Sequence, residues 1–106
     1  MPTDKMKLGL ESEFIAAAWL SKLNYSIYWK TCDNDPIDLV AVNRDNGETL
    51  KIDVKTVSRR KSWKPGTVIT RMPSIIQKKL GVIILYVDRK NNRCRFADSK
   101  RSSAFA

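Results

Sequence analysis

An almost continuous apolar run, Val82 to Val87, constrains the fold of this chain more than any other segment. Such a run is typical of a strand that is buried on both faces, and strands of this kind lie in sheets that helices cover. Gly81 directly precedes the run and is suited to end a short helix over Ser74 to Leu80. The run therefore predicts a layered α/β fold.

A longer helix is predicted nearer the amino terminus, over Leu8 to Leu23. Apolar residues recur there at spacings of three or four, and we expect them to form the face that packs inwards: Leu10, Phe14, Ala17 and Leu20. The segments rich in β-branched, aromatic and other apolar residues predict strands at Tyr25 to Lys30, Ile37 to Val42 and Thr49 to Val57, with an edge strand at Arg93 to Ala97.

The turn residues between Asn43 and Gly47 join the second and third of these strands into a hairpin. The order helix, three strands, helix, strand then implies a small mixed sheet flanked by helices. A chain of 106 residues is expected to form a single domain, with a core over about 8–97 and a tail over 98–106.

The charge of the chain points towards a polyanionic partner such as nucleic acid. Lys and Arg number 20 against 11 Asp and Glu, which gives a formal net charge of +9. The sequence contains no histidine, so histidine-dependent catalytic triads and histidine-ligated zinc are excluded. Any chemistry must therefore use carboxylates, lysine or a hard metal ion.

A basic segment from Ser58 to Arg71 is predicted to be a long loop. Guanidinium groups bind phosphate oxygens and an aromatic ring can stack on an exposed base, so we expect DNA contacts from Arg59, Arg60, Lys61, Trp63, Lys64 and Arg71. A solvated loop without a ligand is the alternative.

The amino-terminal residues are charged and mixed, no stretch has the length of a membrane span, and no CxxC pair is present. These features predict a protein of the cytoplasm, or of the host cell cytoplasm if a phage encodes it, without a membrane partner.

Two acidic residues on neighbouring predicted strands form the most informative constellation, Asp38 and Asp53. Side chains alternate along a strand, so Asp53 and Lys55 share one face while Val54 points into the opposite layer. If the hairpin brings the two carboxylates together, they and the Val54 carbonyl provide oxygen ligands for a hard divalent cation. Such a cation with a lysine beside it suits phosphodiester hydrolysis.

These residues resemble the motif of the PD-(D/E)XK nuclease superfamily, through Pro36, Asp38, Asp53 and Lys55. Ile37 is a departure, because the family usually has proline directly before aspartate. The resemblance implies a restriction-endonuclease-like core and a Mg²⁺-dependent DNA endonuclease in which Mn²⁺ can substitute. Among the branches the chain looks most like the Holliday junction resolvases, which implies a homodimer that acts on branched DNA.

That family also uses a glutamate on its first helix, where this chain has Glu11 and Glu13. Helical geometry puts Glu13 on the face that is expected to pack inwards and Glu11 about 200° away, so we assign Glu13 to the site as a metal ligand. Gln77 on the second helix resembles the polar residue that several branches carry there, and we include it among the DNA-binding candidates.

Each of these residues also has a simpler interpretation. A single aspartate on a strand usually faces solvent, and Lys55 alone could be a charge that protects an edge strand. A nicking, restriction or homing-type nuclease on duplex DNA is the alternative enzyme. A non-catalytic DNA-binding module is the alternative of another class, and the complete set of Asp38, Asp53 and Lys55 argues against it.

Overall fold

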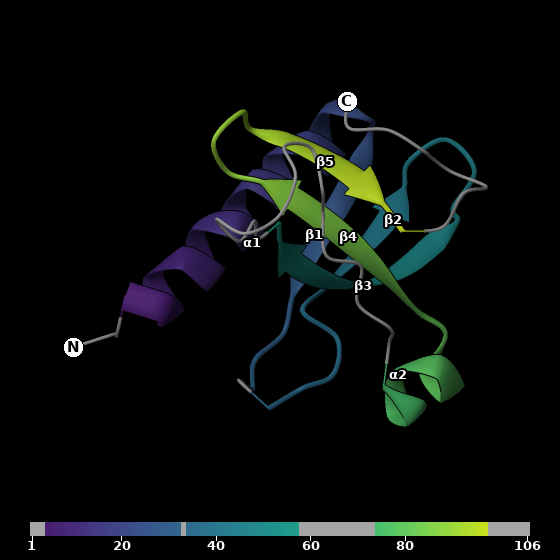
Figure 1. The fold of residues 1–106 in the computed structure, drawn as a ribbon. Coiled ribbons are helices and arrows are strands. Elements are labelled where there is room, and N and C mark those ends of the chain that lie inside the picture. Colours follow the sequence, from purple (N-terminus) through teal and green to yellow (C-terminus); the bar gives the residue numbers. More distant parts are fainter. Residues whose placement is uncertain (1–3, 33, 58–73, 98–106) are drawn as a thin grey trace.

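The computed structural model describes residues 4–32, 34–57 and 74–97. Its elements follow one another in the order α1 (Asp4–Lys22), β1 (Tyr25–Trp29), β2 (Leu39–Asn43), β3 (Thr49–Thr56), α2 (Ile75–Leu80), β4 (Val82–Asp88) and β5 (Arg93–Phe96) (Figure 1). The strands form one sheet in the order β1-β2-β3-β4-β5. Only the β3/β4 pair of this sheet is parallel. The predicted α/β class, a small mixed sheet flanked by helices, is confirmed.

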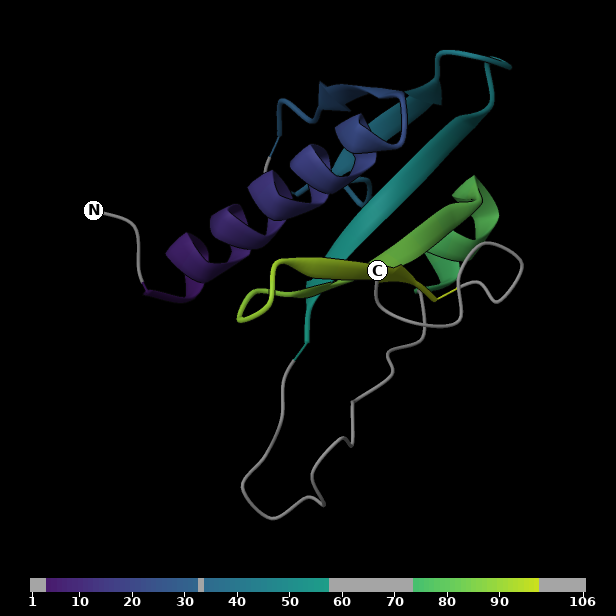
Figure 2. The same ribbon diagram turned by 90° about the horizontal axis from the view of Figure 1, so that it is seen from above.

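The helix α1 lies against one face of the sheet, and the hydrophobic core fills the space between them. α1 and α2 lie on opposite sides of β3 (Figure 2). Buried side chains from the helix and four strands make up this core: Ala16, Leu20, Leu39, Ala41, Leu50, Ile52, Leu85, Val87, Cys94 and Phe96. The side chains on the opposite face of β3 therefore do not belong to this core.

The buried face of α1 differs from the one predicted. Leu10 and Phe14 are 53% and 58% exposed, whereas Ser12, Ala16 and Leu20 face the sheet at a spacing of four residues. A polar residue can lie on this face because the Ser12 hydroxyl bonds the Thr56 hydroxyl of β3 at 2.6 Å. The helix also begins earlier than predicted, at Asp4.

The turn between β2 and β3 sets the register of the hairpin. The side-chain oxygen of Asn43 accepts hydrogen bonds from the backbone N–H groups of Asp45 and Asn46, and Gly47 adopts a positive φ of 76°. Leu39 consequently lies opposite Ile52. In an antiparallel pair this register puts the residue before Leu39, which is Asp38, next to Asp53.

The short helix α2 forms where it was predicted because both of its ends are capped. Ser74 and Gln77 form a capping box at the start, and Gly81 ends the helix in the left-handed conformation, with φ 72°. None of the residues of α2 is buried. Within the described residues, no helix is long and apolar enough to span a bilayer.

The two cysteines lie in contrasting surroundings, which leads to a simple prediction. Cys32 is exposed, whereas burial raises the pKa of the Cys94 thiol to about 12. Because the thiolate is the reactive form, Ellman's reagent at pH 8 should label Cys32 in the native protein and Cys94 only after unfolding. Rapid labelling of two thiols per native chain would contradict this burial. The Cys32→Ser variant serves as the control and should show no rapid labelling.

Candidate active site

Asp38 lies directly before β2, and its side chain, not a further strand residue, binds the backbone of β3 there. The structure thus corrects the prediction of a strand that already starts at Ile37. The Asp38 N–H donates to the Ile52 carbonyl at 2.8 Å. Its carboxylate accepts from the Val54 N–H at 2.7 Å through Oδ2 and from Lys30 Nζ at 2.9 Å through Oδ1. These bonds fix the carboxylate against the middle of β3.

Asp53 lies on the face of β3 that points away from α1, because Ile52 and Val54 on either side of it pack towards the core. The residue is only 5% exposed. Its Oδ2 atom is buried without a hydrogen bond, although Lys55 Nζ lies 3.3 Å away. A buried carboxylate oxygen in this state is costly unless a cation completes its surroundings.

The surroundings of Asp53 raise the pKa of its carboxyl group. Burial is the main cause that raises the pKa of this carboxyl above its usual value of 3.8, and the nearby Asp38 raises it further. The Lys55 ammonium and the Gln77 side chain act in the opposite direction. The raising effects outweigh the lowering ones, so Asp53 binds a proton more readily than an aspartate in water.

Lys55 and Val54 have the orientations that strand alternation predicts. The Val54 side chain packs against the core, while Lys55 reaches Asp53 on the opposite face and keeps 36% of its side chain exposed. The Val54 N–H points towards Asp38. Both backbone polar groups of a strand residue point to the same side, so the Val54 carbonyl also faces the side of Asp38.

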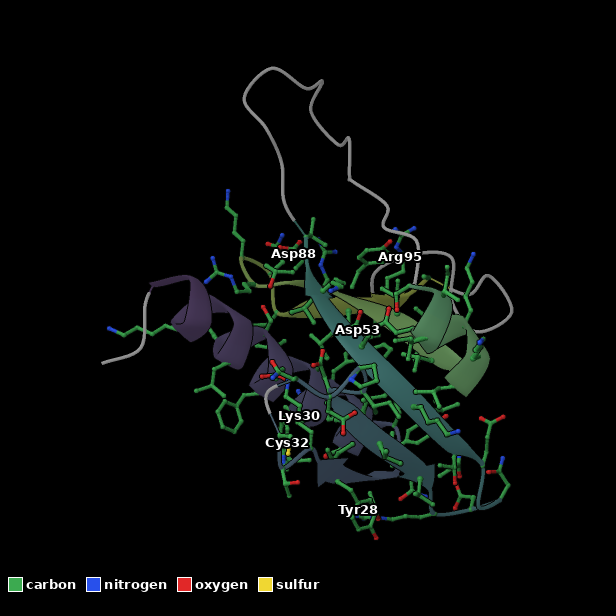
Figure 3. The ribbon with its side chains drawn as sticks, turned by 90° about the horizontal axis from the view of Figure 1, so that it is seen from below. Tyr28, Lys30, Cys32, Asp53, Asp88 and Arg95 are labelled. Atoms are coloured by element: carbon green, nitrogen blue, oxygen red, sulfur yellow. The ribbon has the colours of Figure 1, made fainter. Side chains whose placement is uncertain are left out.

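Glu13 reaches this region from α1, and Lys30 connects it to Asp38. The sequence did not indicate Lys30 as a site residue. Lys30 Nζ lies 3.5 Å from Glu13 Oε1 and 2.9 Å from Asp38 Oδ1. Figure 3 shows Lys30 beside α1, whereas Asp53 lies further along the sheet between α1 and α2. Glu11 points elsewhere and pairs with Arg89 at 2.9 Å.

Gln77 lies at the same site through α2. Its side-chain oxygen accepts from the Ser74 N–H, and its amide nitrogen donates to the Pro36 carbonyl at 3.0 Å. These bonds join the start of α2 to the segment that leads into Asp38. The Gln77 side chain also interacts with the Asp53 carboxyl group and lowers its pKa, so Gln77 lies beside the acidic pair. The sequence predicts only DNA contacts for this residue.

Two of the three predicted carboxylate ligands, Asp38 and Asp53, are placed so that they could hold a cation, whereas Glu13 is not. In the described part of the chain, no three acidic or cysteine side chains are grouped closely enough to hold one ion. Asp38 and Asp53 nevertheless meet beside the Val54 backbone, and the Asp53 Oδ2 atom, which accepts no hydrogen bond, is suited to a hard cation. The pair therefore fits a divalent ion, with Glu13 held apart from it by Lys30.

The predicted DNA contacts of the basic segment cannot be placed in this arrangement. They lie outside the described residues: Arg59, Arg60, Lys61, Trp63, Lys64 and Arg71.

Comparison with known proteins bears on the fold. No protein-family model matches this sequence, and a search of curated proteins finds no match either. Among solved structures, a bacterial homing endonuclease, I-Ssp6803I, matches with a TM-score of 0.63 and 18% sequence identity over 100% of this chain and 72% of the other. At this identity the likeness concerns architecture. The chain therefore has the fold of that homing endonuclease.

Proposed function

We propose that this chain is a Mg²⁺-dependent DNA endonuclease with a site of the PD-(D/E)XK type. The observation that carries the proposal is the meeting of Asp38 with the buried carboxylate of Asp53, whose Oδ2 atom accepts no hydrogen bond and has the Lys55 ammonium 3.3 Å away. The fold likeness to a homing endonuclease and the net charge of +9 support DNA as the substrate.

The roles of the residues follow from their positions. Asp38 and Asp53 would hold the cation together with the Val54 carbonyl, and Mn²⁺ would replace Mg²⁺ there. When bound, such an ion supplies Lewis-acid chemistry, since it lowers the pKa of water and neutralises charge on the phosphoryl oxygens. Asp38 is oriented for this role by the Val54 N–H, which donates to Oδ2 at 2.7 Å.

Lys55 would act on the reacting groups themselves. Its ammonium shares the face of β3 with Asp53 and remains partly exposed, so a phosphate that approaches Asp53 also meets Lys55. A positive charge in this place orients the attacking water and stabilises the negative charge that grows on the phosphate.

Two kinds of DNA target remain candidates. The motif resemblance favours a four-way junction, as in the Holliday junction resolvases. The likeness to a homing endonuclease favours a specific duplex site. Either target needs two strands cut, and one such site cuts one strand, so we propose that two copies act together as a homodimer.

A panel of labelled substrates tests the proposal. Linear duplex, single strand, flap and four-way junction are incubated with the protein in Mg²⁺, with Asp53→Asn as the inactive control. Symmetric nicks confined to the junction would identify a resolvase, and cuts at one sequence in long duplex DNA would identify a homing-type enzyme. Undiminished wild-type cleavage in excess EDTA would refute the metal assignment. Tight DNA binding without a cut in any substrate would instead indicate a binding module.

A further inference from the structure

Lys30 lies between Asp38 and Glu13, both of which the sequence predicts to be metal ligands. It directly follows β1, and the register of Trp29 opposite Leu39 puts it across from Asp38. Its ammonium lies 2.9 Å from Asp38 and 3.5 Å from Glu13. The Lys30 side chain is 22% exposed, so these contacts are partly shielded from solvent.

The bonds of Asp38 determine what a metal ion would meet there. Oδ2 already accepts from the Val54 N–H, and Oδ1 accepts from Lys30. A cation that uses Oδ1 must share this oxygen with the lysine ammonium, at a distance where two positive charges repel each other. A cation that recruits Glu13 as well must enter the place that Lys30 now fills.

We propose that Lys30 is a built-in counter-ion of the site, which competes with the divalent cation for Asp38 and Glu13 and is displaced when the metal binds. This inference rests on the proposed function, because it assumes that the acidic pair binds a metal. It explains why Glu13 and Asp38 approach the same point although no three carboxylates form a group in the described part of the chain.

Charge balance supports this role. Three carboxylates, Glu13, Asp38 and Asp53, face two lysines, Lys30 and Lys55. The Lys30 ammonium contacts both Asp38 and Glu13, whereas Lys55 contacts Asp53. Through these two contacts Lys30 holds Glu13 and Asp38 at one place in the absence of metal.

Manganese binding to the whole chain without DNA tests the inference, because free Mn²⁺ is measured directly by its electron paramagnetic resonance signal. The variants are Lys30→Met, which removes the charge, and Lys30→Gln, which also removes the charge but keeps a donor for Asp38. Lys51→Met is the matched control, since Lys51 also lies in the sheet but binds the Leu80 carbonyl.

Both Lys30 variants should bind Mn²⁺ more tightly than the wild type, on the order of tenfold, while Lys51→Met keeps the wild-type affinity. In EDTA they should melt at a lower temperature than the wild type, and saturating Mn²⁺ should raise their melting temperatures by more than it raises that of the wild type. Tighter binding by Lys30→Gln alone would also support the inference if Lys30→Met fails to fold.

Two outcomes would overturn the inference, and they differ in what else they refute. If the wild type binds Mn²⁺ and the Lys30 variants bind it equally or more weakly, Lys30 is not a competitor, and the proposed metal site stands. If neither the wild type nor the variants bind Mn²⁺, the metal site and the competition are both refuted.

Discussion

Replacing Asp53 with asparagine is expected to abolish DNA cleavage and at the same time to stabilise the metal-free protein. The change removes a proposed metal ligand, so cleavage should fall by several orders of magnitude in a single-turnover assay. It also removes the charge of a buried carboxylate whose Oδ2 atom has no hydrogen bond. This should raise the free energy of unfolding by about 1 kcal/mol. For a chain of this size that is roughly 4 °C in Tm, measured in EDTA.

The stabilisation expected from Asp53→Asn should depend on pH. Because the folded-state pKa of Asp53 is raised, the folded protein binds its proton more readily than the unfolded chain. The stability that this carboxyl contributes is thus fully present below its usual pKa of 3.8 and is lost as the pH rises through the folded-state value. The Tm advantage of Asp53→Asn should be largest at neutral pH and should shrink as the pH falls towards 4.

Asp45→Asn is the matched control, because it removes a carboxylate from the exposed turn between β2 and β3. We expect it to leave cleavage, the Tm and the pH dependence of the Tm as in the wild type. A lower Tm for Asp53→Asn than for the wild type in EDTA at neutral pH would show that the carboxylate is satisfied in the fold. Retained cleavage would remove Asp53 from the site.

Lys55→Ala should reduce the cleavage rate by roughly 10²–10³-fold, as expected when a group that stabilises transition-state charge is lost. Its ammonium is 3.3 Å from Asp53 Oδ2 but is not a metal ligand, so binding of Mn²⁺ should be retained or strengthened. Single-turnover rates at saturating protein separate this effect on the chemical step from weaker DNA binding.

Lys51→Ala is the comparison for this variant, since Lys51 and Lys55 lie on the same face of β3 and Lys51 contacts the Leu80 carbonyl instead of a carboxylate. The two variants have the same net charge, so a general electrostatic effect on DNA binding would appear in both. Equal single-turnover rates for Lys55→Ala and the wild type would make Lys55 an ordinary surface charge.

Most of the sheet could be predicted because its signals are local. The apolar run of β4, the turn residues after Asn43 and the Gly81 cap each depend on near neighbours in sequence, and the structure confirms the elements that they predicted. The start of β2 was predicted two residues too early. There the side chain of Asp38, instead of a further strand residue, pairs with the Val54 N–H.

The orientation of α1 could not be predicted correctly, because spacing identifies a helix without showing which side meets the sheet. Leu10 and Phe14 suggested one face, but Ser12 and Ala16 occupy the buried one. Small side chains let the helix approach the strands, and Ser12 is tolerated only through its bond to Thr56. That partner lies on β3, far away in sequence, so no local pattern reveals it.

The acidic pair was predicted from its spacing, whereas Lys30 was overlooked. Its signal is weak in sequence, since one lysine at the end of a strand is common on protein surfaces. A stronger signal lies in the hairpin register, because Trp29 opposite Leu39 makes Lys30 and Asp38 cross-strand neighbours of opposite charge. The sequence does not show this register, because the connection from Trp29 to Leu39 is too long for a tight turn to set it.

The order of the strands also has a consequence for how the chain folds. Neighbours in sequence form the antiparallel β1–β2–β3 unit, whereas the parallel β4 can join only after the chain from Val57 to Gly81 has crossed back. Closing the longer loop costs more conformational entropy, so we expect hydrogen-exchange protection to develop in β2 and β3 before it develops in β4. Asp38 would then meet Asp53 early in folding, before the sheet is complete, and β4 would dock beside two carboxylates that already lie together.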